Sequence, residues 1–171
     1  NMRATDPAYP ALTMTNWVLG GSGFTSRLMS RLREKDGLSY GAGSSLRVGH
    51  FDDASSLFCY AILAPQNALK GMKALLEEVT LFNEKGIGEE EWKNLKNGYL
   101  QNYERDLNND RYVLAELHYT TYTNQTMHYL TKLNDAVKGL TPAQVITVAK
   151  QYLDATKFNQ ITAGDESKVA K

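Results

Sequence analysis

Hydrophobic residues recur at helical spacing near the start of the chain. Asp6 followed by Pro7 is a typical helix start, and apolar residues at helical spacing continue as far as a pair of glycines, Gly20 and Gly21. The pattern predicts a first helix that begins at Pro7 and ends at this glycine pair.

A second helix is predicted from Phe24 to about Lys35. Phe24, Leu28 and Leu32 fall at positions i, i+4 and i+8, so they share one face of a helix. Gly37 follows, where glycine commonly ends a helix. The glycines between the two helices are interpreted as a turn and not as a phosphate-binding loop, because they follow a helix and lack the Gly-Lys-Ser/Thr ending.

From Leu38 the pattern changes to the alternation that is typical of a strand. One face of this predicted strand carries every second residue, namely Leu38, Tyr40, Ala42, Ser44, Leu46 and Val48. Turn residues follow at 49–53, and the apolar run 57–63 ends before Pro65. Together these segments predict an antiparallel hairpin.

The chain from Pro65 to about Leu153 is helical in pattern. One helix is predicted to begin after Gly88, and the last one begins at a capping box over residues 141–144. Residues 157–163 could form a final strand. A sheet of only three strands would have unpaired edges, so we expect that a further strand belongs to it.

These elements predict an α+β fold in which an antiparallel β-sheet packs against several α-helices. With 171 residues, of which 42% are hydrophobic, the chain is long enough to bury one core, so residues 1–171 are taken as a single domain. The opening Asn1-Met2 and the expected extra strand suggest a partial domain.

Charge excludes two classes of partner. The 19 basic and 19 acidic residues cancel, so no general field attracts nucleic acid or an anionic membrane surface. No apolar run approaches the roughly 18 to 20 residues that span a bilayer. Neither a nucleic-acid partner nor a membrane span is therefore expected.

The chain offers few residues for chemistry of its own. His50, His118 and His128 do not form a His-Glu-x-x-His or His-x-x-Glu-His arrangement, so no zinc site is expected here. Cys59 is the sole cysteine and lies inside an apolar run, which favours a small buried residue over a nucleophile. A single cysteine leaves the cellular compartment open.

A longer motif occupies residues 16–40. A helix ending in Leu-Gly-Gly is followed by Ser-Arg-Leu and then by Leu-Arg-Glu-Lys-Asp-Gly-Leu-Ser-Tyr at 32–40. Downstream, Gly-Glu-Glu-Glu-Trp at 88–92 and Leu-Thr-Pro-Ala-Gln-Val at 140–145 fit the same pattern. In these segments the chain resembles the zinc-free, C-terminal domain of M16 (pitrilysin/insulinase) peptidases, and the resemblance covers nearly its whole length.

The resemblance implies a role for two residues. In M16 peptidases two homologous halves close over an unfolded peptide; one half carries zinc, and the other supplies an arginine and a tyrosine that reach the substrate. Arg33 and Tyr40 match these positions and are expected to bind substrate and stabilise the transition state. A guanidinium can donate two hydrogen bonds to a carbonyl or carboxylate, and a phenol can donate one.

The residues alone leave plainer alternatives open. Arg33 could be a solvated charge beside acidic neighbours, and Tyr40 could be an ordinary strand residue. Arg27 and Arg31 are expected to be structural, although either could line the same chamber.

The resemblance also implies what the chain lacks. The family domain begins with at least one strand ahead of the helix at Pro7, so the N-terminal strand or strands are expected to be missing. Zinc is expected on the missing catalytic half, on the same polypeptide or on a partner subunit, so this chain should not hydrolyse peptides alone and carries no cofactor itself. The alternative function is a non-catalytic scaffolding or peptide-binding subunit of the same fold. A bacterial periplasm or cytoplasm is expected, with the family resemblance favouring the periplasm.

Overall fold

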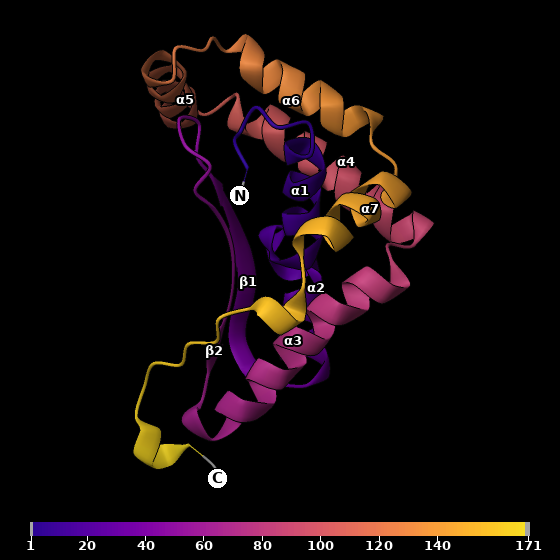
Figure 1. Cartoon of the computed structure of the whole chain (residues 1–171), viewed down its shortest axis with the longest axis vertical. Coiled ribbons are helices and arrows are strands. Elements are labelled where there is room, and N and C mark those ends of the chain that lie inside the picture. The colour runs from indigo at the N-terminus through magenta and orange to yellow at the C-terminus, as the bar shows by residue number, and fades with distance from the viewer. Residues whose placement is uncertain (1, 170–171) are drawn as a thin grey trace.

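The computed structural model describes residues 2–169, in which helices pack beside a two-stranded hairpin. The elements are α1 (Tyr9–Asn16), α2 (Arg27–Met29), β1 (Ser39–Val48), β2 (Ser55–Leu63), α3 (Ala68–Lys85), α4 (Glu89–Asp106), α5 (Asp110–Tyr122), α6 (His128–Gly139) and α7 (Pro142–Tyr152). Two π-helical turns, Trp17–Gly21 and Ser30–Lys35, extend α1 and α2. Figure 1 shows the hairpin along the long axis of the molecule, with α1 to α3 beside it and α5 and α6 beyond one end. The predicted α+β class is confirmed.

The first helix starts two residues later than predicted, and the last one starts as predicted. Helix α1 begins at Tyr9, because the Asp6 carboxylate accepts a hydrogen bond from Ala8 N at 2.8 Å and stabilises a turn ahead of the helix. At α7, Thr141 Oγ1 accepts from Gln144 N at 3.3 Å and Gln144 Oε1 accepts from Thr141 N at 2.9 Å. The predicted capping box is thus confirmed.

The inner side of β1 is in close contact with the turn that ends the first helix. Gly20 lies so near that a Cβ on it would come within 2.1 Å of the Ser44 backbone nitrogen. The Ser44 hydroxyl also lies 2.8 Å from Asn16 Oδ1, to which it donates a hydrogen bond. Only glycine at position 20 permits this approach of helix to strand.

Strand β1 departs from regular pairing at Tyr40. The register passes from Ser39↔Leu63 directly to Gly41↔Ile62, so Tyr40 is the extra residue of a β-bulge. The extra residue reverses the alternation, which leaves Ser39 buried and Tyr40 exposed. The prediction that Tyr40 shares a face with Ala42 and the following inner residues is therefore wrong.

Two clusters of buried apolar side chains hold the helices and the hairpin together. The larger cluster comprises Ala11, Met14, Val18, Leu19, Phe82, Ile87, Trp92, Leu95, Val137, Val145, Ala149 and Leu153. The smaller cluster comprises Leu28, Leu32, Ala42, Ala74, Leu75 and Val79. Phe158 is half-buried and packs against both, so it ties the segment after α7 to the core.

The predicted strand at 157–163 is wrong. Ala155–Lys157 forms a 3-10 turn, and the chain after it has no regular secondary structure up to residue 163. Figure 1 shows this segment crossing beside β2, yet Ile161 is 81% exposed. A strand is stable only when a neighbour accepts and donates its backbone hydrogen bonds.

Ahead of α1 the chain lies against the tip of the hairpin. Arg3 forms an isolated parallel bridge with Gly49, and Ala4 N donates to Gly49 O at 2.9 Å. This is a single bridge and not a strand. Within residues 2–169 the sheet therefore has two strands.

Cys59 is predicted to be unreactive in the folded protein. It packs against the smaller core cluster, and burial raises the pKa of its thiol to about 11. We expect slow reaction with an aromatic disulfide reagent at pH 8 and rapid reaction after unfolding in guanidinium chloride. Rapid labelling of the folded chain would contradict the burial.

The same thiol makes stability depend on pH. Its folded pKa lies above the value of about 8.5 in an unfolded chain, so folding favours the neutral thiol. This contribution is complete below about pH 8.5 and is lost as the pH rises toward about 11. Denaturant titrations at both ends of this window measure it, and Cys59→Ala should remove this part of the dependence.

Candidate functional site

A tight turn between the second helix and β1 brings Arg33 close to Tyr40. Leu38 N donates to Leu32 O at 2.8 Å, which closes the end of the helix. Gly37 adopts a φ of 60°, a conformation that side chains disfavour. The turn between the second helix and β1 therefore brings the Arg33 guanidinium carbon to 5.7 Å from the centre of the Tyr40 ring.

Arg33 lies in the π-helical turn Ser30–Lys35. Within this turn Asp36 N donates to Arg31 O, five residues back, at 3.0 Å. Such turns are rare in proteins and frequently occur at functional sites. The wider turn is part of what directs the Arg33 side chain toward the start of β1.

The Arg33 guanidinium lies between two exposed aromatic rings. Its central carbon is 5.0 Å from the centre of the Phe24 ring and 5.7 Å from that of Tyr40. Phe24 is 65% exposed and Tyr40 is 82% exposed. At exposed sites each cation–π contact contributes about 0.5–1 kcal/mol, which favours this orientation while leaving the N–H donors available.

The sequence placed Phe24 on the buried face of the second helix, and this prediction is wrong. Phe24 lies in the 3-10 turn Gly23–Thr25, ahead of α2, whereas Leu28 and Leu32 are fully buried as predicted. A break in the helix shifts the register of residues before it, so the i, i+4, i+8 spacing does not extend to position 24. Phe24 is a site residue that the sequence pattern missed.

The two neighbouring arginines are structural. Arg27 donates to both carboxylate oxygens of Glu91 at 2.7 Å and to Gly86 O at 2.6 Å. Arg31 donates to Asp36 at 2.7 Å and to Glu77 at 3.1 Å, and the Asp36 hydrogen bond raises the pKa of Arg31.

Arg33 differs from both because it has no ion pair with any side chain that the structure describes, those of residues 2–165 and 167–169. Its acidic neighbours are otherwise engaged: Asp36 bonds to Arg31, and Glu34 accepts from Ser30 at 3.1 Å. The solvent-exposed guanidinium is therefore held by aromatic rings and keeps its hydrogen-bond donors for another molecule.

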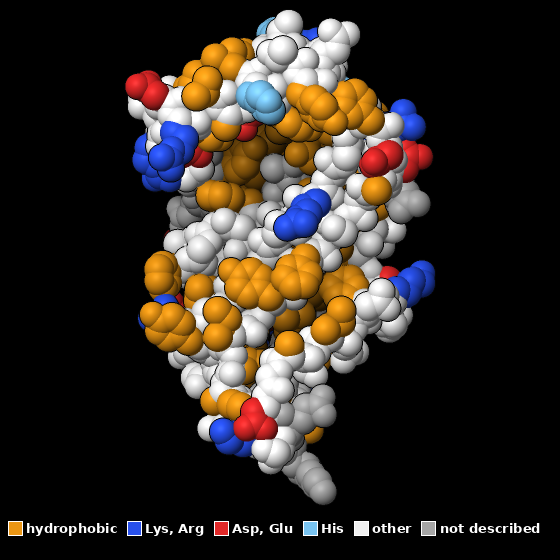
Figure 2. All heavy atoms as spheres, turned by 90° about the vertical axis from the view of Figure 1, so that its left-hand side faces the viewer, with side chains coloured by type: hydrophobic (Ala, Val, Ile, Leu, Met, Phe, Trp, Pro, Cys, Tyr) orange, Lys and Arg blue, Asp and Glu red, His pale blue; other side chains and the backbone are white. Residues whose placement is uncertain are grey.

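An apolar row adjoins this site on the outer face of the hairpin. Phe58, Tyr60 and Ile62 point outward from β2 with exposures of 60%, 42% and 59%. The Phe58 and Tyr60 rings are stacked with centres 6.2 Å apart, and Ile62 is paired beside the bulge at Tyr40. Figure 2 shows hydrophobic side chains gathered across the middle of this side of the molecule.

The sequence of β2 contains a signal for this exposed row. The run 57–63 is apolar at every position and does not alternate with polar residues, which is typical of a strand covered on both faces. Among the described residues the helices cover its inner face.

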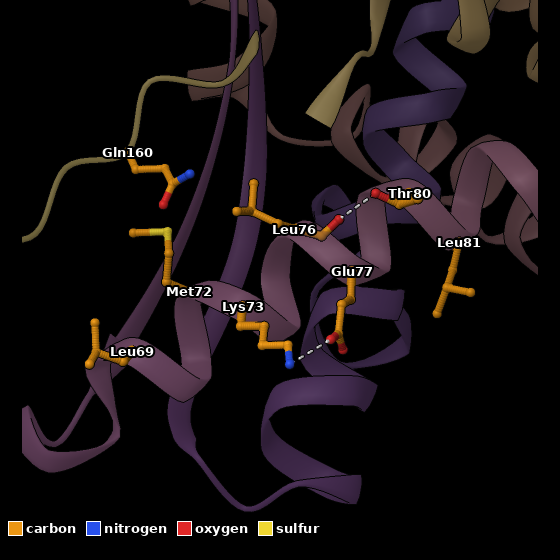
Figure 3. Close-up of a pocket in the computed structure, with 8 residues that line it drawn as sticks. All are labelled: Leu69, Met72, Lys73, Leu76, Glu77, Thr80, Leu81 and Gln160. Atoms are coloured by element: carbon orange, nitrogen blue, oxygen red, sulfur yellow. Dashed lines mark hydrogen bonds and ion pairs between the residues drawn. The ribbon is translucent and has the colours of Figure 1, made fainter. Parts of the chain in front are cut away.

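A separate apolar groove of about 630 Å³ runs along α3. Figure 3 shows Leu69, Met72 and Leu76 along it, with Gln160 of the C-terminal segment at its edge. Lys73 and Glu77 form an ion pair of 3.8 Å on the same helix. Neither Arg33 nor Tyr40 lines this groove.

The described residues offer no donor set for a metal. No group of three His, Cys, Asp or Glu side chains within residues 2–165 and 167–169 is arranged to hold an ion. Over the same range, every helix is too short or too polar to cross a membrane.

Comparison with solved structures shows the fold. A crystal structure of the peptidase M16 inactive domain from Pseudomonas fluorescens matches with a TM-score of 0.76 at 24% identity, over 91% of this chain and 37% of that one. A protease from Helicobacter pylori matches with a TM-score of 0.76 at 20% identity, over 91% and 37%. The periplasmic protease PqqL from Escherichia coli matches with a TM-score of 0.63 at 20% identity, over 86% and 16%. The chain thus spans little more than a third of the first two structures.

Comparison with sequences shows the family. Among curated proteins none matches significantly. The family described as "Peptidase M16 inactive domain" matches residues 2–99, a segment that contains Arg33, Tyr40 and the whole hairpin. Because this segment is more than half of the chain, the protein belongs to the M16 peptidase inactive-domain family.

Proposed function

We propose that this chain is the substrate-binding, zinc-free half of an M16 zinc metallopeptidase. Arg33 and Tyr40 bind the peptide and donate hydrogen bonds at a zinc site that lies on another domain or subunit. The observation that carries the proposal is the exposed, unpaired Arg33 guanidinium stacked between Phe24 and Tyr40. The peptidase acts in a bacterial periplasm, where the similar PqqL is also found.

The chemistry at Arg33 fits a peptide ligand. A planar guanidinium without a carboxylate partner can donate two parallel hydrogen bonds to a backbone carbonyl or to a terminal carboxylate. The flanking rings restrict the side chain before substrate arrives, so less conformational entropy is lost on binding.

Tyr40 supplies a second donor close by. Its ring is 5.7 Å from the Arg33 guanidinium carbon, and the bulge holds it outward. A phenol can donate to a carbonyl oxygen as that oxygen gains negative charge at the zinc. Together the two side chains form a small anion-stabilising site without any metal of their own.

The rival function is a scaffolding or peptide-binding subunit without catalysis. The exposed row of Phe58, Tyr60 and Ile62 favours it, because exposed apolar surface commonly marks a contact with another protein. The two functions differ in one respect: a scaffold needs neither hydrogen-bond donor, whereas the peptidase needs both.

Tyr40→Phe is the test that separates them. The zinc-bearing half and this chain are combined, and peptide turnover is measured with each alone and with both. We expect turnover only with both, and we expect Tyr40→Phe to lower kcat/KM about 10²-fold, as loss of one preorganised donor does in other enzymes.

Tyr60→Phe is the matched control. It removes a phenol from the same face of the hairpin, 42% exposed, and should leave kcat/KM within about twofold. Full turnover by the Tyr40→Phe assembly would exclude the donor role and support the scaffold.

A further inference from the structure

The Ser39 hydroxyl occupies the centre of the bulge that exposes Tyr40. Ser39 is 8% exposed, and its Oγ accepts a hydrogen bond from Gly41 N at 3.1 Å. The same Oγ lies 2.7 Å from Gly41 O and 2.9 Å from Ile62 O. A hydroxyl has one hydrogen, so it donates to one of these carbonyls at a time while it accepts from Gly41.

The bulge decides on which face Tyr40 lies. The inner face of β1 is fixed farther along by the buried residues Ala42 and Ser44. Counting back from these residues in a regular strand places Tyr40 on the inner face, toward the helices, and Ser39 on the outer face. The extra residue exchanges the two, and the Ser39 hydroxyl then bonds to backbone groups of both strands at the bulge.

We propose that Ser39 is the positioning residue of Tyr40: its hydroxyl holds the bulge that keeps the phenol on the outer face beside Arg33. This inference rests on the proposed function, because the phenol matters only if it meets substrate. Alanine at position 39 keeps the strand but removes the hydrogen bonds, so it favours regular pairing or a mixture of registers. Threonine keeps the hydroxyl and suits a strand.

The kinetic test uses this chain assembled with its zinc-bearing half. Ser39→Ala is expected to lower kcat about tenfold with KM changed less than about twofold, because misplacing a group that acts in the transition state affects the rate more than binding. Ser39→Thr is expected to retain most of the wild-type kcat, because threonine keeps the hydroxyl. Ser45→Ala, which removes an exposed serine on the same strand, serves as control and should leave kcat unchanged.

A double-mutant cycle distinguishes positioning from general damage to the fold. If Ser39 acts through the Tyr40 hydroxyl, Ser39→Ala has no further effect on kcat once Tyr40→Phe is present. An equal loss in both backgrounds would overturn the proposal. Unfolding midpoints of all variants are measured to show that each one folds.

A second readout does not depend on activity. Nitration of Tyr40, measured by mass spectrometry of its peptide, should be rapid in the wild-type chain, where the ring is 82% exposed, and several-fold slower in Ser39→Ala. Unchanged nitration in a folded Ser39→Ala variant overturns the positioning role. Slower nitration in Ser39→Ala would support the positioning role. If Tyr40→Phe then showed full turnover, the result would contradict the proposed function and not the positioning role.

Discussion

Replacing Arg33 by alanine is expected to lower kcat/KM of the assembled peptidase about 10³-fold. The change removes two aligned N–H donors and leaves a peptide carbonyl or carboxylate without these partners. Because the side chain is exposed and makes no ion pair with the side chains of residues 2–165 and 167–169, its loss should lower the free energy of unfolding only by what its two cation–π contacts contribute, about 1–2 kcal/mol.

Two further variants make this prediction specific. Arg33→Lys keeps the charge but loses the planar pair of donors, so it should recover only a small part of the rate. Arg47→Ala removes an exposed arginine from β1 and should leave kcat/KM within about twofold. Equal losses in Arg33→Ala and Arg47→Ala would show that general charge, and not the stacked guanidinium, is what the substrate requires.

The largest expected effect on stability is at Gly20. A methyl group there would lie 2.1 Å from the Ser44 backbone nitrogen and 2.5 Å from the Gly43 carbonyl carbon. Backbone atoms cannot rotate away as a side chain does, so the first helix must move off β1. We expect Gly20→Ala to lower the free energy of unfolding by roughly 3 kcal/mol or more.

Gly98→Ala is the matched control for this prediction. Gly98 lies inside α4, and a Cβ there would meet no atom within 4 Å. Alanine should therefore stabilise the chain by about 0.5–1 kcal/mol through its better helix propensity. Denaturant titration of both variants measures the difference, and a Gly20→Ala chain as stable as the wild type would contradict the close approach.

The sequence predicted the elements better than the faces they present. Local spacing is enough to recognise helices and a hairpin, because burying one side of each element imposes a period of 3.6 or 2 residues. The side on which Tyr40 lies depends on its pairing with β2 and on the Ser39 hydroxyl, and neither follows from the alternation of β1 alone. Phe24 escaped prediction for a related reason, since the helix break before α2 shifts its register.

The segment 157–163 failed as a strand for a different reason. Its composition is compatible with a strand, but strand formation depends on a neighbouring backbone, which local sequence does not specify. The roles of Arg33 and Tyr40 were predicted from a family resemblance. Spacing alone was equally compatible with a solvated charge at Arg33 and an ordinary strand residue at Tyr40. The sequence predicted structural roles for Arg27 and Arg31 but not their partners, because Glu91 lies 64 positions from Arg27 and Glu77 lies 46 positions from Arg31.

Both sides of the helix-to-strand turn contain one residue more than a regular element holds. On the helix side the excess is the π-helical turn Ser30–Lys35, and on the strand side it is the bulge at Tyr40. One residue corresponds to about 100° of rotation in a helix and to a change of face in a strand. The directions in which the Arg33 and Tyr40 side chains point thus depend on the number of residues in the helix and in the strand. A single deletion between positions 30 and 40 would redirect one of these side chains even if every contacting side chain were kept.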